Sequence, residues 1–236
     1  MSHAVLPFTA MSAVPTPPPM LGSLLRHHIA TRRDVQTGRA ASELRLHGGT
    51  QLTLRPIEPQ DADALAALIA RLSPSARRNR FHGAVQVSVD DARKMCCLEG
   101  IREVAFVVTA KESGVECVVA DARYCVDKNT DAVESDSAEF AVMVDERWQR
   151  RGLGGWAMAA LRDTAQAAGL HWLHGEVLST NLPMLRLMRC CGLCCTPDAE
   201  DDGLVQVQER LGLAGGFPTH PQPRTAIQKL QHWITR

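Results

Sequence analysis

The sequence predicts a mixed α/β domain in which helices flank one central sheet. Three observations between residues 51 and 211 carry this prediction. Segments of strand-like alternation are interleaved with segments whose apolar residues recur with a helical period. Prolines, glycines and small polar residues mark the boundaries of these segments. The expected element order, β-α-α-β-β-β-α-β-α-β, places both types in a single region, and 45% hydrophobic residues can supply its core.

The first expected elements are one strand and two helices. Residues 51–57, QLTLRPI, alternate like a strand, and residues 61–72, DADALAALIARL, have the apolar period of a helix. Pro59 precedes that helix and the sequence SPS follows it, which sets its limits. The stretch SVDDARKMCCL predicts a second, short helix capped by Ser88 or Asp90, because both residue types cap helices well.

Strands dominate the middle of the region and helices return after it. VAFVVTA at residues 104–110 and CVVADARYCVD at residues 117–127 form a predicted hairpin around the turn ESG, and AEFAVMV at residues 138–144 is a further strand. Apolar residues from Leu153 to Ala168 follow the i, i+3, i+4 rule of an amphipathic helix. A strand, a helix and a weaker last strand are expected at residues 172–178, 181–191 and 205–211.

The expected domain covers residues 47–211, between a disordered leader at residues 1–46 and a C-terminal tail at residues 212–236. The leader contains PTPPP and LLRHHIATRRDVQTGRA, a composition with too few apolar residues to sustain a core. Helical spacing of four leader residues leaves a short docking helix as the alternative (Leu21, Leu24, Leu25 and Ile29).

Composition and charge argue against several classes of partner. Basic and acidic residues are equal at 26 each, which argues against nucleic acid as a partner, and no apolar run suggests a membrane partner. Eight cysteines without an apolar signal segment predict reduced thiols in a cytoplasmic protein. The cysteines of CCGLCC, with His171 and His174, could surround a zinc ion, but a zinc signature needs a second spaced ligand pair, so we expect no metal.

The stretch QRRGLG, residues 149–154, lies between an expected strand end and a helix start. Backbone N–H groups of a first helical turn have no partners within the helix and attract anions. Gly152 and Gly154 let the backbone approach a ligand, and Arg150 and Arg151 can pair with phosphate oxygens. The P-loop and the dinucleotide-binding pattern both fit poorly, and glycine spacing alone leaves a structural turn open.

The longer stretch VDERWQRRGLG resembles the Q/R-x-x-G-x-G/A element of the GNAT N-acetyltransferase superfamily. GEVLSTNLPMLRLMRCCGL, residues 175–193, is similar to the family's second element, in which an Asn opens a helix that ends at Gly. The family's order of elements fits residues 51–211, and RLSPSARRNRF looks closest to the GNAT domain of bacterial Pat-type protein lysine acetyltransferases.

The resemblance implies a GNAT fold, with a mixed and mostly antiparallel central sheet, and acetyl-CoA as cosubstrate without a metal. It implies direct acetyl transfer to an amine, either a protein lysine or a small molecule. In the family, the glycine element binds the pyrophosphate, and the Asn contacts CoA while it caps its helix. Backbone groups at the end of the central strand hold the pantetheine arm and polarise the thioester carbonyl. The residues that match these positions are Met143, Val144, Gln149, Arg150, Arg151, Gly152, Leu153, Gly154, Gly155 and Asn181.

The amine must lose its proton before it attacks, so a carboxylate near the central strand is the expected base. Glu139 stands where many family members place one, and it shares a face of its strand with Ala141 and Met143. Glu176 on the adjacent strand is the second candidate, and the sequence does not choose between them.

One position departs from the family pattern. Many members carry a Tyr late in the second element as the acid that protonates the leaving thiolate, and the matching residue here is Met188. The chain's only tyrosine is Tyr124, in an earlier strand. A non-catalytic acyl-CoA-binding sensor or interaction module with the same fold therefore remains the rival hypothesis.

Overall fold

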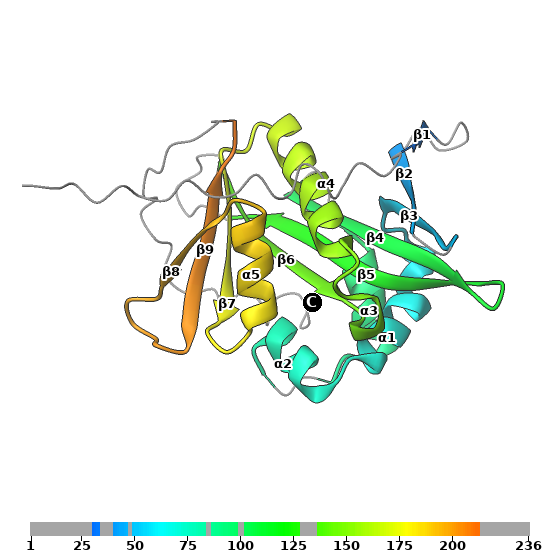
Figure 1. Cartoon of the computed structure of the whole chain (residues 1–236), viewed down its shortest axis with the longest axis horizontal. Coiled ribbons are helices and arrows are strands. Elements are labelled where there is room, and N and C mark those ends of the chain that lie inside the picture. Colours follow the sequence, from blue (N-terminus) through cyan, green and yellow to red (C-terminus); the bar gives the residue numbers. More distant parts are fainter. Residues whose placement is uncertain are drawn as a thin grey trace, which may run out of the picture.

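The computed structural model describes residues 30–33, 40–46, 49–83, 86–98, 102–127 and 136–212, and their strands form one sheet (Figure 1). The sheet order is β1-β2-β3-β4-β5-β6-β7-β9-β8. Every neighbouring pair is antiparallel except β6 and β7, which confirms the predicted mixed and mostly antiparallel sheet. The strands are β1 (Ala30–Arg33), β2 (Ala40–Arg45), β3 (Gln51–Pro56), β4 (Glu103–Glu112), β5 (Val115–Val126), β6 (Ser137–Val144), β7 (Trp172–Leu178), β8 (Cys194–Pro197) and β9 (Leu204–Arg210).

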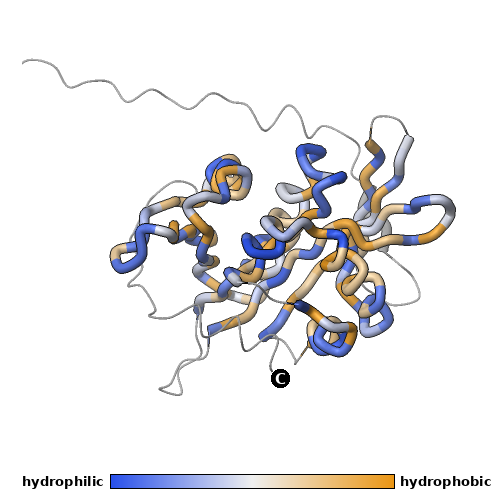
Figure 2. Tube along the Cα trace, turned by 90° about the horizontal axis from the view of Figure 1, so that it is seen from below, coloured by the Kyte–Doolittle hydropathy of each residue, from blue (hydrophilic) through white to orange (hydrophobic). Residues whose placement is uncertain are grey.

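Helices cover both faces of the sheet, and each face has its own apolar cluster. On one face pack α1 (Ala62–Arg71), α2 (Pro74–Phe81) and α3 (Val89–Cys96); on the other pack α4 (Leu153–Ala167) and α5 (Leu182–Cys190). Strand β6 serves both clusters, because Val142 belongs to the α4 side and Met143 to the α1 side. Figure 2 shows hydrophobic stretches along the central strands between the helices.

Polar caps set the starts of three helices. Ser73 accepts a hydrogen bond from the backbone N–H of Ala76 at 3.1 Å, before α2. Ser88, rather than Asp90, caps α3 and forms a capping box with Asp91. Asn181 caps α5 by accepting from the backbone N–H of Met184 at 3.3 Å, so its predicted capping role is present.

The sheet opens between its two parallel strands. Strands β6 and β7 pair only where Ser137 to Glu139 face Trp172 to His174. Beside the divergence lies Gly175, where a Cβ atom would come within 3.1 Å of the Phe140 carbonyl oxygen. Within the described residues, the rest of β6 has no strand on its β7 side, so its backbone groups face a gap that a ligand can enter.

The prediction that residues 1–46 form a disordered leader is wrong for residues 40–45, which form strand β2. Strand β2 pairs with β3, with Leu44 opposite Leu52, and Leu44 is only 5% exposed. An edge strand takes most of its stability from backbone hydrogen bonds and a few apolar contacts, so the polar composition did not reveal it. Strand β1 continues the sheet beyond β2. Residues 1–29 and 34–39 of the leader, and the tail after residue 212, lie outside the described residues.

Shortening the chain to begin at Gly48 should destabilise it, because β2 would be lost and Leu52 and Leu54 uncovered. Burial of Leu44 alone is worth about 2 kcal/mol of unfolding free energy. We expect the melting temperature to fall by about 4–8 °C. A chain that begins at Arg39 keeps β2 and is the matched control. Equal melting temperatures of the two shortened chains, measured by circular dichroism, would show that β2 contributes nothing.

Candidate active site

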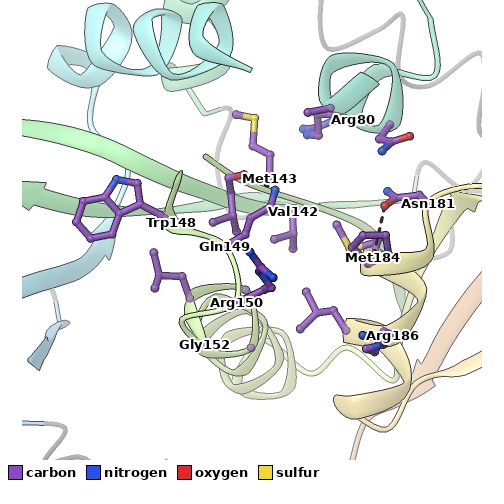
Figure 3. Close-up of a pocket in the computed structure, with 18 of the residues that line it drawn as sticks. Arg80, Val142, Met143, Trp148, Gln149, Arg150, Gly152, Asn181, Met184 and Arg186 are labelled. Atoms are coloured by element: carbon purple, nitrogen blue, oxygen red, sulfur yellow. Dashed lines mark hydrogen bonds between the residues drawn. The ribbon is translucent and has the colours of Figure 1, made fainter. Parts of the chain in front are cut away.

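A pocket of about 320 Å³ occupies the gap where β6 and β7 diverge (Figure 3). The end of β6 forms its floor, and the loop into α4 forms one wall. The opposite walls come from α5 and from the segment around α2. Because Val142 and Met143 face opposite sides of the sheet and both line the pocket, the pocket reaches both faces.

Nine of the ten predicted cosubstrate-binding residues line this pocket: Met143, Val144, Gln149, Arg150, Gly152, Leu153, Gly154, Gly155 and Asn181. The tenth, Arg151, does not; its guanidinium lies over the Trp148 ring at 5.0 Å from the centroid. Trp148 itself lines the pocket, so Arg151 contacts the pocket wall through this ring.

The loop before α4 has a conformation that requires glycine. Gly152 has φ +87°, and it precedes the helix without any side-chain cap. The first N–H groups of this 15-residue helix therefore lack a side-chain partner at the wall of the pocket. At Gly154 a Cβ atom would lie 2.7 Å from Leu187 Cδ2, so glycine lets α4 and α5 approach closely. The arrangement can bind an anion by the N–H groups of α4.

Asp145 anchors the loop to the rest of the domain. Its carboxylate is buried and accepts hydrogen bonds from Arg71 Nε at 3.0 Å, from Arg147 Nη2 at 2.8 Å and from the Arg147 backbone N–H at 3.0 Å. Burial alone would raise the pKa of Asp145, but the hydrogen bonds from Arg147 and Arg71 outweigh it and the pKa is lowered. The carboxylate thus ties the end of α1 to the start of the ligand-binding loop.

Replacing Asp145 by Asn should cost about 2 kcal/mol of unfolding free energy at neutral pH, because two arginines lose a charged partner. The cost is no larger because both arginine side chains are partly exposed to solvent. A lowered pKa in the folded state means that this stabilisation is present above the unfolded pKa of about 3.9 and is lost as pH falls through the folded pKa. The difference in unfolding free energy between the two proteins, measured by urea unfolding, should therefore shrink as the pH falls below about 3.9. A difference that persists in acid would assign the effect to packing instead.

Neither predicted base lines the pocket. Glu139 and Glu176 are half-buried on the sheet face that carries α2. Glu139 is four residues before Met143 on the same face of β6, about 13 Å along the strand. Glu176 Oε1 accepts a hydrogen bond from Gln206 Nε2 at 3.0 Å. The structure thus brings both carboxylates to one sheet face, at the start of the divergence, and leaves the choice between them open.

The sequence did not reveal that two histidines, His174 and His82, lie beside these carboxylates. His174 is directly opposite Glu139 in the β6–β7 pair, and its Nε2 lies 2.8 Å from Asp127 Oδ2. His82 lies near Glu176; burial lowers the pKa of His82, while the charge and the backbone of Glu176 oppose this. Only the register of the sheet and the position of α2 bring these groups together, so no spacing in the sequence marks them.

Helices α2 and α5 supply further pocket residues that were not predicted. Helix α2 contributes Asn79 and Arg80, from a segment with little apolar periodicity. Helix α5 contributes Met184, Leu187 and Cys190, at i, i+3 and i+6. That spacing marks one face of a helix and could have been extended from Asn181 in the sequence. Helix α5 also contributes Pro183 and Arg186.

No tyrosine lines the pocket, since the chain's only one is elsewhere. Tyr124 is 1% exposed in the core on the α4 side, and its hydroxyl has no hydrogen-bond partner among the described residues. Met188 is fully buried in the same core. A leaving thiolate in this pocket would therefore take its proton from water or from another side chain.

The described residues hold no group of three or more His, Cys, Asp or Glu side chains arranged to bind a metal ion. All eight cysteines fall within the described ranges and are free thiols. None of the helices in the described ranges is both long and apolar enough to span a membrane.

Comparison with known proteins identifies the family. The family model of the acetyltransferase (GNAT) domain matches residues 51–194. The chain is 28% identical to an acetyltransferase of Pseudomonas aeruginosa over 169 residues, 71% of this chain and 87% of that protein. It is 26% identical to acetyltransferase Pat of Mycolicibacterium smegmatis over 178 residues, 74% of this chain but only 50% of that relative.

Solved structures show the same fold. The GNAT domain of S. lividans PAT has a TM-score of 0.63 at 22% identity, over 72% of this chain and 97% of that one. The structure of yncA from Salmonella typhimurium, solved with acetyl-CoA, has a TM-score of 0.53 at 20% identity, over 72% and 99% of the two chains. Because the family model matches more than half of the chain, the protein belongs to the GNAT acetyltransferases, enzymes that use acetyl-CoA as cosubstrate.

Proposed function

We propose that this protein is an N-acetyltransferase that passes the acetyl group of acetyl-CoA directly to an amine. The observation that carries the proposal is the junction, in one pocket, of a strand edge with no neighbouring strand and a helix start with no side-chain cap. Val142 to Val144 supply the strand edge, and Gly152 precedes the helix. A pantetheine arm, which is an amide chain, can pair with the first, and a pyrophosphate can bind the second.

In this proposal the phosphates of acetyl-CoA lie at the mouth of the pocket. Arg150 lines the wall formed by the α4 loop, and Arg186 lines the facing wall on α5, so the two guanidinium groups can bind phosphate oxygens from both sides (Figure 3). The pantetheine arm then runs along β6 toward Val142. This direction brings the thioester to the divergence of β6 and β7, on the side of Glu139.

The amine must be neutral to attack, and Glu139 is the proposed base, with Glu176 as the alternative. Since neither carboxylate lines the pocket, the proton would travel through a water molecule or reach Glu139 when the acceptor is bound. The proposed acceptor is a protein lysine, because the chain resembles Pat-type enzymes, and a small amine is tested beside it.

A non-catalytic acyl-CoA sensor is the second candidate. It is favoured by one observation: the family's usual tyrosine position is Met188, which is buried in the core. Without a side-chain acid, transfer would depend on solvent to protonate the thiolate. Transfer would then be slow, and the protein would act as an acyl-CoA-binding sensor.

The deciding experiment is incubation of the purified protein with acetyl-CoA and a panel of proteins and small amines. Free thiol is measured with a chromogenic disulfide, and the acetylated nitrogen is located by mass spectrometry. An enzyme should release thiol only when an acceptor is present. Acetyl-CoA binding by calorimetry without acceptor-dependent thiol release from any member of the panel would support the sensor.

A further inference from the structure

The wall of the pocket on the α2 side carries a cation that the proposed mechanism does not yet use. Arg80 lines the pocket, and its Nε is buried without a hydrogen-bond partner among the described residues. Figure 3 shows Arg80 across the pocket from Arg150 and Arg186. Because Nε has no protein acceptor, the guanidinium is not fully paired within the described residues, and the part of the side chain that lines the pocket can donate to an oxygen of a ligand there.

Arg80 remains charged at neutral pH although its surroundings lower its pKa. Burial lowers its pKa to about 10, the charge of Arg123 adds to this, and the charges of Asp121 and Glu139 oppose it. Asp121 is already engaged, because it accepts a hydrogen bond from Arg123 Nε at 2.9 Å. The Arg80 guanidinium is therefore a half-buried cation at neutral pH, and a negative charge that develops beside it is stabilised.

The position of Arg80 selects the part of acyl-CoA that reaches it. The phosphates are expected at Arg150, Arg186 and the start of α4, on the opposite side of the pocket. The pantetheine arm is expected along the edge of β6 between these two sides. The group that arrives near Arg80 is then the acyl group, whose only oxygen is the thioester carbonyl.

Resting on the acetyltransferase function above, we propose that Arg80 is a second donor to the acyl carbonyl oxygen, beside the backbone at the end of β6, and stabilises the oxyanion that forms there. When the amine nitrogen bonds to the carbonyl carbon, the π electron pair moves onto that oxygen beside the guanidinium. The pair returns as the C–S bond breaks, the amine proton passes to the base, and CoA leaves as a thiolate. A preorganised donor of this kind accelerates the step because negative charge develops next to it.

Replacing Arg80 by Met tests the proposal, because Met places an apolar side chain beside Phe81, whose ring centroid lies 5.0 Å from the Arg80 guanidinium carbon, and removes the donor. Calorimetry compares two probes: acetyl-CoA and S-ethyl-CoA, a thioether that lacks the carbonyl oxygen. The native protein should bind acetyl-CoA about tenfold more tightly than S-ethyl-CoA, and the variant should lose most of this preference. Turnover should fall on the order of 100-fold, and added guanidinium should restore part of it.

Two further variants keep the test decisive. Arg78→Ala removes an exposed arginine from the same helix and should leave binding and turnover unchanged. Arg80→Lys keeps the charge, so it should retain part of the preference for acetyl-CoA and part of the turnover. It replaces Arg80→Met as the test if the Met variant has a much lower melting temperature. A tenfold preference for acetyl-CoA that survives in Arg80→Met overturns the proposal. Failure of the native protein to bind either probe contradicts instead the proposed function on which it rests.

Discussion

Replacing Glu139 by Gln should lower turnover by about two to four orders of magnitude and leave acetyl-CoA affinity nearly unchanged. The amide keeps the shape of the side chain but cannot accept the proton of the amine. Binding should be preserved because Glu139 is outside the pocket that we assign to the cosubstrate. Steady-state kinetics with an acceptor from the panel, and calorimetry with acetyl-CoA, measure the two effects separately.

The pH dependence of this variant provides an internal check. At high pH more of the free amine has already lost its proton, so the variant should recover part of its activity as pH rises. Glu176→Gln is the matched control on the adjacent strand and should be the milder change. Full activity of Glu139→Gln at neutral pH, together with an inactive Glu176→Gln, would place the base on β7 instead of β6.

The sequence predicted the central elements well because their side chains report their surroundings. Residues 138–144 alternate between the two helix layers as expected, and α4 buries the predicted apolar stripe, including Leu153 and Leu161. The elements that it missed lack such a signal. Helix α2 buries only Phe81, and β8 is a four-residue strand at the edge of the sheet. Short or edge elements depend on backbone pairing and neighbours, which composition does not record.

The pocket was predictable where it is contiguous in sequence. The loop from Gln149 to Gly155 carries its function in adjacent residues, so a motif identifies it. Arg80 and Arg186 reach the same pocket from helices that are far apart in the chain. Their arrangement depends on the packing of α2 and α5 against the sheet, which no local pattern contains. The neighbours of Glu139 show the same limit, since His174 comes beside it only through the parallel register of β6 and β7.

Replacing Gly152 by Trp should weaken acetyl-CoA binding by at least about 100-fold, because an indole ring would occupy the pocket where we place the pyrophosphate, and each tenfold step is 1.4 kcal/mol. The backbone itself resists the change, since φ +87° costs a side-chain-bearing residue roughly 1–2 kcal/mol. Gly152→Ala carries this strain without the bulk and should bind with intermediate affinity.

Gly169→Ala is a control that separates the effect of backbone strain from the effect of a side chain that fills the pocket. Gly169 has φ +80° and open space around its Cβ position, as Gly152 does, but it follows the other end of α4 and does not line the pocket. Both alanine variants should lose similar unfolding free energy, whereas only the Gly152 variants should lose affinity in calorimetry. If Gly152→Trp bound acetyl-CoA as tightly as the native chain, the pyrophosphate would have to lie away from the start of α4, and our placement of the cosubstrate would be wrong.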